Sequence, residues 1–367
     1  MAEAKLDLES FLAEQSFGFG TVPLSPIAAE NRALLRELES YDPLRTVSTF
    51  AGLLTAAELQ SNTLRLEVLA HLALAVCGGR RKPNAKLISH LFAQFGNGTA
   101  GRLEDPAEDV FVSNIATRRG NFRILEGVWE SAGFHVQRIV DLLEGLPAGG
   151  RYGLLRESVY ALLQLSDLLC ERAGLTRHQL GADIPLEKLP QRIAASAGAM
   201  RRLVRFSTAE LGEQGISLDR LAAFGFDPAR RGDLVTEAIG HSTLERYPLA
   251  LHNDEILFLL PTATSAAIRR VVVEQMDALN LREAFIQTLA LEYGKLFSRT
   301  PLLGEKSGAP IEFKRTTSGL FAGVLTRVDH GLYLNFVFFV DALEDFDKAG
   351  LVGTNLDAKA LAADLDR

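Results

Sequence analysis

The sequence predicts a mainly α-helical protein, with an irregular multi-helical N-terminal region followed by a smaller α+β region that contains two β-hairpins. Three observations predict this fold class. Helix-start signals recur through the first half, apolar residues follow them at helical spacing, and β-rich segments bounded by turn residues begin only near residue 248. No fixed repeat period is apparent, which argues against a regular helical solenoid.

Several helices are predicted from a capping residue followed by proline, whose missing N–H costs nothing at the first helical position. Such pairs occur at Ser25-Pro26, Asp42-Pro43 and Asp105-Pro106, and Thr55 with Glu58 has the spacing of a capping box. The apolar pattern predicts helices over residues 56–76, 86–95, 121–144 and 152–173. Shorter helices are expected over residues 208–215 and 218–224.

The first β-hairpin is predicted from strands at residues 248–251 and 255–260 around His252-Asn253-Asp254, since Asn and Asp tolerate the turn conformation. Helices over 265–279 and 282–297 follow, and then strands over 310–315, 321–328 and 332–340. The last two strands form the second hairpin around Asp329-His330-Gly331. Because residues 336–340 are apolar on both faces, we expect a central strand covered by helices.

Chain length and composition predict an ordinary globular protein with more than one domain. A chain of 367 residues exceeds the size at which one core stops growing. We divide it into a helical domain at residues 1–206, a connector of short helices at 207–247 and an α+β domain at 248–367. No signal peptide precedes them, and no apolar run approaches the roughly 20 residues that span a bilayer, so we expect a cytoplasmic protein.

Metal and redox chemistry have weak support in the residue pattern. Cys77 and Cys170 lie far apart in expected helices and fit buried free thiols in a reducing compartment. The seven histidines have no zinc-site spacing. The glycines of residues 96–101 have the spacing of a dinucleotide-binding loop, but a helix rather than a strand precedes them, so an inter-helix loop is favoured.

The densest run of functional-type side chains begins at Arg118, Arg119 and Arg123. We expect these arginines to lie at the start of the helix over residues 121–144 and to form a binding surface. Other short basic clusters are Arg80, Arg81 and Lys82; Arg201, Arg202 and Arg205; and Arg269 and Arg270. If these clusters lay on one side of the fold, they would contact phosphates. The sequence alone does not show whether they do.

The most chemical-looking segment is a predicted strand that carries Glu312 and Lys314 on one face. This Glu-x-Lys resembles half of the site of metal-dependent nucleases of the restriction-endonuclease-like group. The resemblance implies that Glu312 is a metal ligand and Lys314 a cation near the attacking water. It covers three residues, and it departs from the group because no aspartate lies between Asp277 and Asp329. Glu292, on the preceding predicted helix, is the acid that we place in the alternative site.

The favoured function is a non-enzymatic binding or assembly module that forms part of a larger multidomain system, because no complete catalytic constellation is visible. We expect a protein partner, leave a nucleic-acid partner open and expect no membrane. No cofactor or metal is expected unless the alternative is correct. That alternative is a metal-dependent nuclease or a nuclease-derived domain at Glu292, Glu312 and Lys314, for which Mg²⁺ would be needed. The sequence alone leaves open whether the chain is an enzyme.

Overall fold

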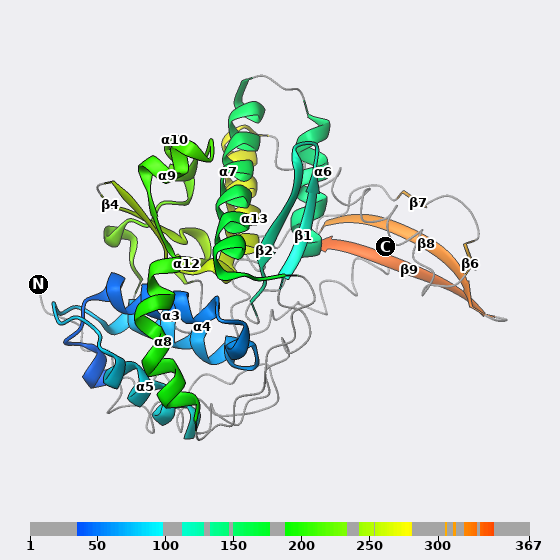
Figure 1. The fold of residues 1–367 in the computed structure, drawn as a ribbon. Helices are drawn as coiled ribbons and strands as arrows, with labels where there is room; N and C mark the ends of the chain where they lie inside the picture. Colours follow the sequence, from blue (N-terminus) through cyan, green and yellow to red (C-terminus); the bar gives the residue numbers. More distant parts are fainter. Residues whose placement is uncertain are drawn as a thin grey trace, which may run out of the picture.

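The computed structural model describes residues 35–97, 112–127, 133–146, 150–176, 188–232, 242–252 and 254–280, and four strands between residues 305 and 340. Over these residues it confirms a mainly α fold with small antiparallel sheets (Figure 1). No helix in the described ranges is long and apolar enough to cross a membrane. The predicted helices that begin at Pro26 and Pro106 lie outside these ranges.

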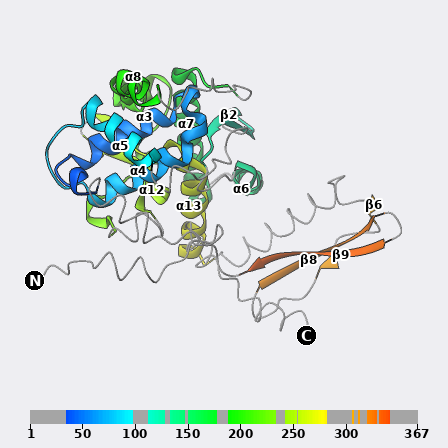
Figure 2. The same ribbon diagram turned by 90° about the horizontal axis from the view of Figure 1, so that it is seen from below.

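A group of helices forms the first part of the described chain. It contains α3 (Pro43–Leu54), the 3-10 helix η1 (Ala57–Asn62), α4 (Thr63–Val76), α5 (Ala85–Asn97) and the later α8 (Leu189–Leu203). α3 packs against both α4 and α8 (Figures 1 and 2). A Cβ at Gly52 would lie 2.5 Å from the main-chain carbon of Met200. Only glycine therefore allows α3 and α8 to approach this closely.

Capping residues explain where α3 begins and ends. The Asp42 side chain accepts the N–H of Arg45 at 2.9 Å, and Pro43 follows at the first helical position, as predicted. The predicted capping box at Thr55 is wrong, because the Thr55 hydroxyl instead donates to the Gly52 carbonyl at 2.7 Å and ends α3. The single helix predicted over residues 56–76 is accordingly two elements, η1 and α4.

The helix predicted over residues 121–144 is wrong in its first part. The chain forms a hairpin of β1 (Val112–Thr117) and β2 (Gly120–Leu125), and only then α6 (Gly133–Gly145). Gly120 closes the turn at φ 138°, a conformation that disfavours residues with a Cβ. α7 (Gly150–Ala173) follows where a helix was predicted, and Figure 1 shows the hairpin lying beside α6 and α7.

A three-stranded sheet occupies the other end of the described body. β3 (Arg205–Ser207), β4 (Leu249–His252) and β5 (Glu255–Phe258) are antiparallel in the order β3-β5-β4, which confirms the first predicted hairpin. The short elements that join this sheet to the rest are α9 (Thr208–Glu213), α10 (Leu218–Leu221), η3 (Ala222–Phe224), η4 (Pro228–Arg230), α12 (Thr243–Arg246) and η5 (Pro261–Ala263). The longer helix α13 (Thr264–Ala278) follows η5.

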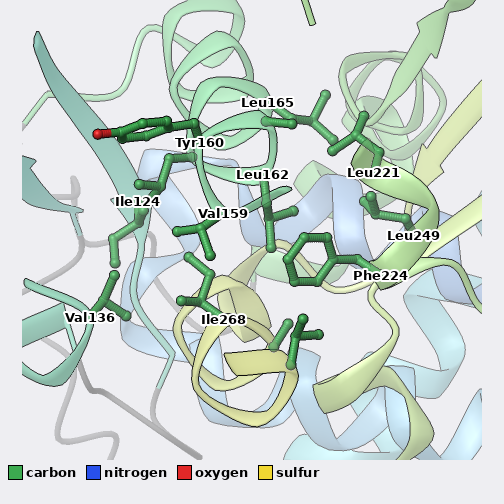
Figure 3. Close-up of a cluster of buried hydrophobic side chains, with 14 of the residues drawn as sticks. Ile124, Val136, Val159, Tyr160, Leu162, Leu165, Leu221, Phe224, Leu249 and Ile268 are labelled. Carbon is green, nitrogen blue, oxygen red and sulfur yellow. The ribbon is translucent and has the colours of Figure 1, made fainter. Parts of the chain in front are cut away.

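The core around α7 joins segments that are distant in the sequence. Ile124 on β2, Val136 on α6, Val159 on α7, Phe224 on η3 and Ile268 on α13 lie in one buried cluster (Figure 3). These residues are almost fully excluded from solvent. Burial of side chains of this size stabilises the fold by about 1.5–3 kcal/mol each. The hairpin and α13 are therefore held to α7 by the same apolar core.

The C-terminal strands form a separate four-stranded antiparallel sheet. It contains β6 (Glu305–Lys306), β7 (Ile311–Glu312), β8 (Gly319–Val328) and β9 (Gly331–Val340). β8 and β9 pair along their whole length, which confirms the second predicted hairpin. The expected central position of the last strand is wrong for the described strands, since β8 is the one with neighbours on both sides. No described helix covers β9 in Figure 1 or Figure 2.

Candidate functional site

The three predicted binding residues lie on the β1–β2 hairpin and not on a helix. Arg118 and Arg119 form its turn, and Arg123 lies on β2. We refer to these three residues as the hairpin arginines. The predicted location was wrong because Gly120, expected to precede a helix, instead closes a hairpin turn. The structure does not bring all three together, since Arg119 pairs with Glu157 and Arg123 pairs with Asp167, about three helical turns farther along α7.

Arg118 and Arg119 meet acids of α6 and α7. The Arg118 main-chain N–H donates to Glu144 Oε1 at 2.8 Å, and Arg118 Nε lies 3.8 Å from the other oxygen of that carboxylate. The Arg118 side chain is 70% exposed. Arg119 makes a two-pronged ion pair with Glu157, with one N–O distance of 2.8 Å. Its guanidinium also lies over the Tyr160 ring, 4.3 Å from the centroid. Both residues therefore fasten the turn to neighbouring helices.

Tyr160 connects these two arginine contacts. Its hydroxyl donates to Glu144, and its ring belongs to the buried cluster of Figure 3, where the hydroxyl points away from the other labelled side chains. Burial, followed by the neighbouring Glu144, raises the pKa of Tyr160 to about 12. The phenol is consequently a neutral hydrogen-bond donor near neutral pH.

Arg123 is held more completely than the other two arginines. Its main-chain N–H and its Nε both donate to Asp167 Oδ1, at 2.9 and 2.6 Å. The guanidinium also reaches the carbonyl oxygen of Leu175 at 3.3 Å. The hydrogen bond to Asp167 raises the pKa of Arg123. Arg123 therefore joins β2 to the C-terminal half of α7, and its donors are used inside the fold.

The residues of the nuclease alternative are described only in part. Glu312 is the second residue of β7 and lies opposite Ala322 on β8. Glu292 and Lys314 lie outside the described residues. Another acid, Glu305, begins strand β6 and lies opposite Arg327 of β8. The described residues contain no group of three or more His, Cys, Asp or Glu arranged to hold a metal ion.

A buried polar junction forms around His71 that the spacing of the histidines along the sequence does not indicate. His71 Nδ1 lies 2.7 Å from Ser242 Oγ, although the two residues are 171 positions apart. Both are almost fully buried, and burial lowers the pKa of His71 to about 3. The imidazole is therefore neutral, and since Ser242 Oγ accepts the Leu244 N–H, its own hydrogen can be donated to Nδ1.

The same junction contains a buried ion pair. Arg270 of α13 donates to Glu245 of α12 at 2.6 Å, and the two side chains are only 7% and 4% exposed. Glu67, on the same face of α4 as His71, lies so close to Gly127 that a Cβ there would be 2.0 Å from its carboxylate oxygen. These contacts join α4, α12 and α13 in the interior. The sequence signal was one acid, Glu67, four residues before His71 in a mostly apolar helix.

Both cysteines are buried free thiols, as predicted. Burial is the main cause that raises the pKa of Cys77 to about 11 and that of Cys170 to about 12. Thiols of this kind are poor nucleophiles near neutral pH. They fill the core and do not contribute a reactive site.

Comparison with known families identifies the chain's biological setting. A family described as anti-phage protein Upx-like matches residues 16–367, which is nearly the whole chain. The chain belongs to this Upx-like anti-phage family. No curated protein and no solved structure matches it. A role in defence against phage therefore rests on the family, while the chemistry of that role must be argued from this chain's own residues.

Proposed function

We propose that this anti-phage protein is a metal-dependent nuclease that cleaves nucleic acid with Glu292, Glu312 and Lys314. The observation that carries the proposal is the position of Glu312 on β7, in a sheet that continues through β8 and β9. Lys314 follows two residues later, the spacing at which strand residues share a face. Cleavage of nucleic acid is also a direct way to stop a phage, which agrees with the family.

The donor set of this proposed site suits a hard divalent cation. Carboxylate oxygens such as those of Glu312 and Glu292 are the ligands that Mg²⁺ and Mn²⁺ prefer. Such an ion, when bound, supplies Lewis-acid polarisation of a phosphate oxygen. Within the protein, the Lys314 ammonium would orient the attacking water and offset the negative charge that develops on the phosphate.

The test is a cleavage assay with defined variants. The full chain is incubated with single- and double-stranded DNA and RNA, with Mg²⁺, with Mn²⁺ or with EDTA. We expect metal-dependent cleavage that falls at least about a hundredfold in Lys314→Ala and Glu312→Gln. Lys188→Ala, which removes an exposed lysine before α8, is the matched control and should cleave as the wild type does. Cleavage that persists in both site variants, or that never occurs with either metal, contradicts the proposal.

A second proposal is a non-enzymatic binding or assembly module with a protein partner. The observation in its favour is the exposed Arg118 guanidinium at the tip of the hairpin. Arg119 and Arg123 support it less, because their donors already bind Glu157 and Asp167. A pull-down from phage-infected cells compares the wild type with an Arg118→Ala variant, which leaves the contacts of Arg119 in place. Loss of a captured protein at unchanged thermal stability supports this function, and equal capture removes it.

A further inference from the structure

A group of arginines lies where α3 and α8 cross. Arg45 is in the first turn of α3, and Arg201 and Arg202 are in the last turn of α8. The close approach at Gly52, whose Cβ position lies 2.6 Å from the Arg201 nitrogen, fixes the two helices relative to one another. Figures 1 and 2 both show α3 and α8 side by side. Three guanidinium groups from two distant parts of the sequence are thereby gathered at one surface.

The charges of this group are close enough to affect one another. The pKa of Arg201 is lowered first by partial burial and then by the positive charges of Arg205, Arg45 and Arg202. Arg45 and Arg202 are exposed. Within the described part of the chain, no carboxylate forms an ion pair with Arg45, Arg201 or Arg202. Their neighbour Arg205 differs, because it pairs with Glu255.

A second basic segment lies against the start of α3. The Asp42 N–H donates to the Arg81 carbonyl at 2.8 Å, and the Arg81 N–H donates to the Ser40 carbonyl at 3.1 Å. These bonds hold Arg80, Arg81 and Lys82 beside the first turn of α3, and all three are exposed. The Arg81 guanidinium also lies over the Tyr41 ring at 4.9 Å. We call the six residues Arg45, Arg80, Arg81, Lys82, Arg201 and Arg202 the α3–α8 basic surface.

We propose that the α3–α8 basic surface binds the phosphate backbone of a nucleic-acid strand. Like charges held together without acids repel one another, and a bound polyanion relieves that repulsion. The six residues come from three chain segments, so the surface suits a chain of phosphates better than one small anion. Arginine also matches phosphate geometry through its planar fork. The inference deepens the proposed nuclease function by giving that activity a surface that captures its substrate.

The Asp42 carboxylate lies beside the first turn of α3, and it is already engaged as a helix cap. It accepts the Arg45 N–H as the cap of α3 and therefore faces the main chain of the first turn. The net charge of the whole chain, −7, does not oppose local binding, because exposed charges farther apart than about 10 Å are largely screened at ordinary salt concentrations.

The test measures binding without cleavage. Fluorescence anisotropy of a labelled single strand and a labelled duplex is followed in EDTA at several salt concentrations. The variant Arg45→Ala, Arg201→Ala, Arg202→Ala is compared with Arg138→Ala, Arg220→Ala, Arg230→Ala, which removes the same charge elsewhere. We expect the first variant to bind at least about tenfold more weakly, with a log–log salt slope shallower by about 2 to 3. The control variant should bind like the wild type, and thermal melting checks that both are folded.

Three results would overturn this inference. They are equal affinity of the surface variant and the wild type, equal weakening in both variants, and displacement of the nucleic acid by polyglutamate at the same charge concentration. Failure of the proposed nuclease activity can be distinguished from failure of the binding surface. A chain that never cleaves, but whose binding is lost in the surface variant, keeps the binding surface and loses the enzyme. If cleavage depends on Lys314 but the surface variant binds nucleic acid normally, the nuclease is kept and the binding surface is lost.

Discussion

The hairpin arginines and the α3–α8 basic surface are both clusters of basic residues in the sequence, yet the fold treats them differently. Each hairpin arginine has a carboxylate partner, namely Glu144, Glu157 or Asp167. The arginines at the crossing of α3 and α8 have none among the described residues. The pKa of Arg201 is lowered first by partial burial and then by the positive charges of its arginine neighbours. The difference teaches that local density of basic residues does not identify a binding surface. A binding surface is better identified by the basic side chains that have no carboxylate partner in the folded structure.

The largest expected effect lies at Arg270, the most buried arginine among the described ion pairs. Arg270→Met should lower the free energy of unfolding by about 3–5 kcal/mol, because it leaves the Glu245 carboxylate buried without this partner. Chemical denaturation measures the change. The double variant Glu245→Leu, Arg270→Met removes both charges and should recover most of the loss. If Arg270→Met is as stable as the wild type, water must reach the Glu245–Arg270 ion pair in solution.

The pH dependence of stability extends the comparison to a side chain that burial keeps uncharged. The His71 pKa of about 3 in the folded chain lies below the unfolded value of 6.5, so the unfolded state binds more protons between these values. Stability should therefore fall as the pH drops below about 6.5, by about 2 kcal/mol at pH 5 from this group alone. His71→Gln should flatten this slope.

The control for the histidine prediction is His90→Gln. His90 is 48% exposed and lies 3.5 Å from Glu37, so its removal should leave the steep acid dependence in place. Denaturation curves between pH 7 and pH 5 compare the three proteins. Equal slopes for wild type and His71→Gln would mean that the imidazole gains solvent or a proton before the fold opens.

Arg118 and Arg123 lie on the same hairpin and differ in how firmly the fold holds them, so the stability of their variants can be compared directly. Arg123→Ala should lower the free energy of unfolding by about 1.5–3 kcal/mol, because the Asp167 carboxylate loses a charged donor in a partly buried site. Arg118→Ala should change it by less than about 1 kcal/mol, since its ion pair is long and its guanidinium faces solvent. Denaturant titration decides between them. Equal losses of unfolding free energy in the two variants would mean that the exposure of an arginine side chain does not determine how much it stabilises the fold.

Much of the fold was predictable because its signals are local. Asp42 and Pro43 mark the start of α3, and the turn residues between β8 and β9 mark a hairpin, in both cases through chemistry confined to a few neighbours. The helix predicted across residues 121–125 failed because Gly120 decides the local structure there. A glycine can begin a loop, end a helix or close a hairpin, and its φ of 138° was not encoded by its neighbours.

The candidate site was less predictable because its contacts are distant in sequence. Arg123 meets Asp167 across 44 positions, and His71 meets Ser242 across 171. Neither spacing forms a motif. The basic residues Arg201 and Arg202 were recognised as a cluster, but Arg45 was not linked to them, because only the crossing at Gly52 brings the two helices together. Glu312 and Lys314 were visible from strand alternation alone, whereas a third acid requires the tertiary fold.

The smallest expected effect concerns the cost of leaving arginines without partners. Arg201→Gln should leave the free energy of unfolding unchanged or raise it by a few tenths of a kcal/mol, because it removes a charge that its three arginine neighbours repel. Since dissolved ions screen that repulsion, added NaCl should stabilise the wild type slightly more than the variant. Melting temperatures measured from low to moderate salt test both points, with Arg220→Gln as the control. A clear loss of stability in Arg201→Gln, at every salt concentration, would show that this arginine has a partner in the folded protein and belongs with the hairpin arginines.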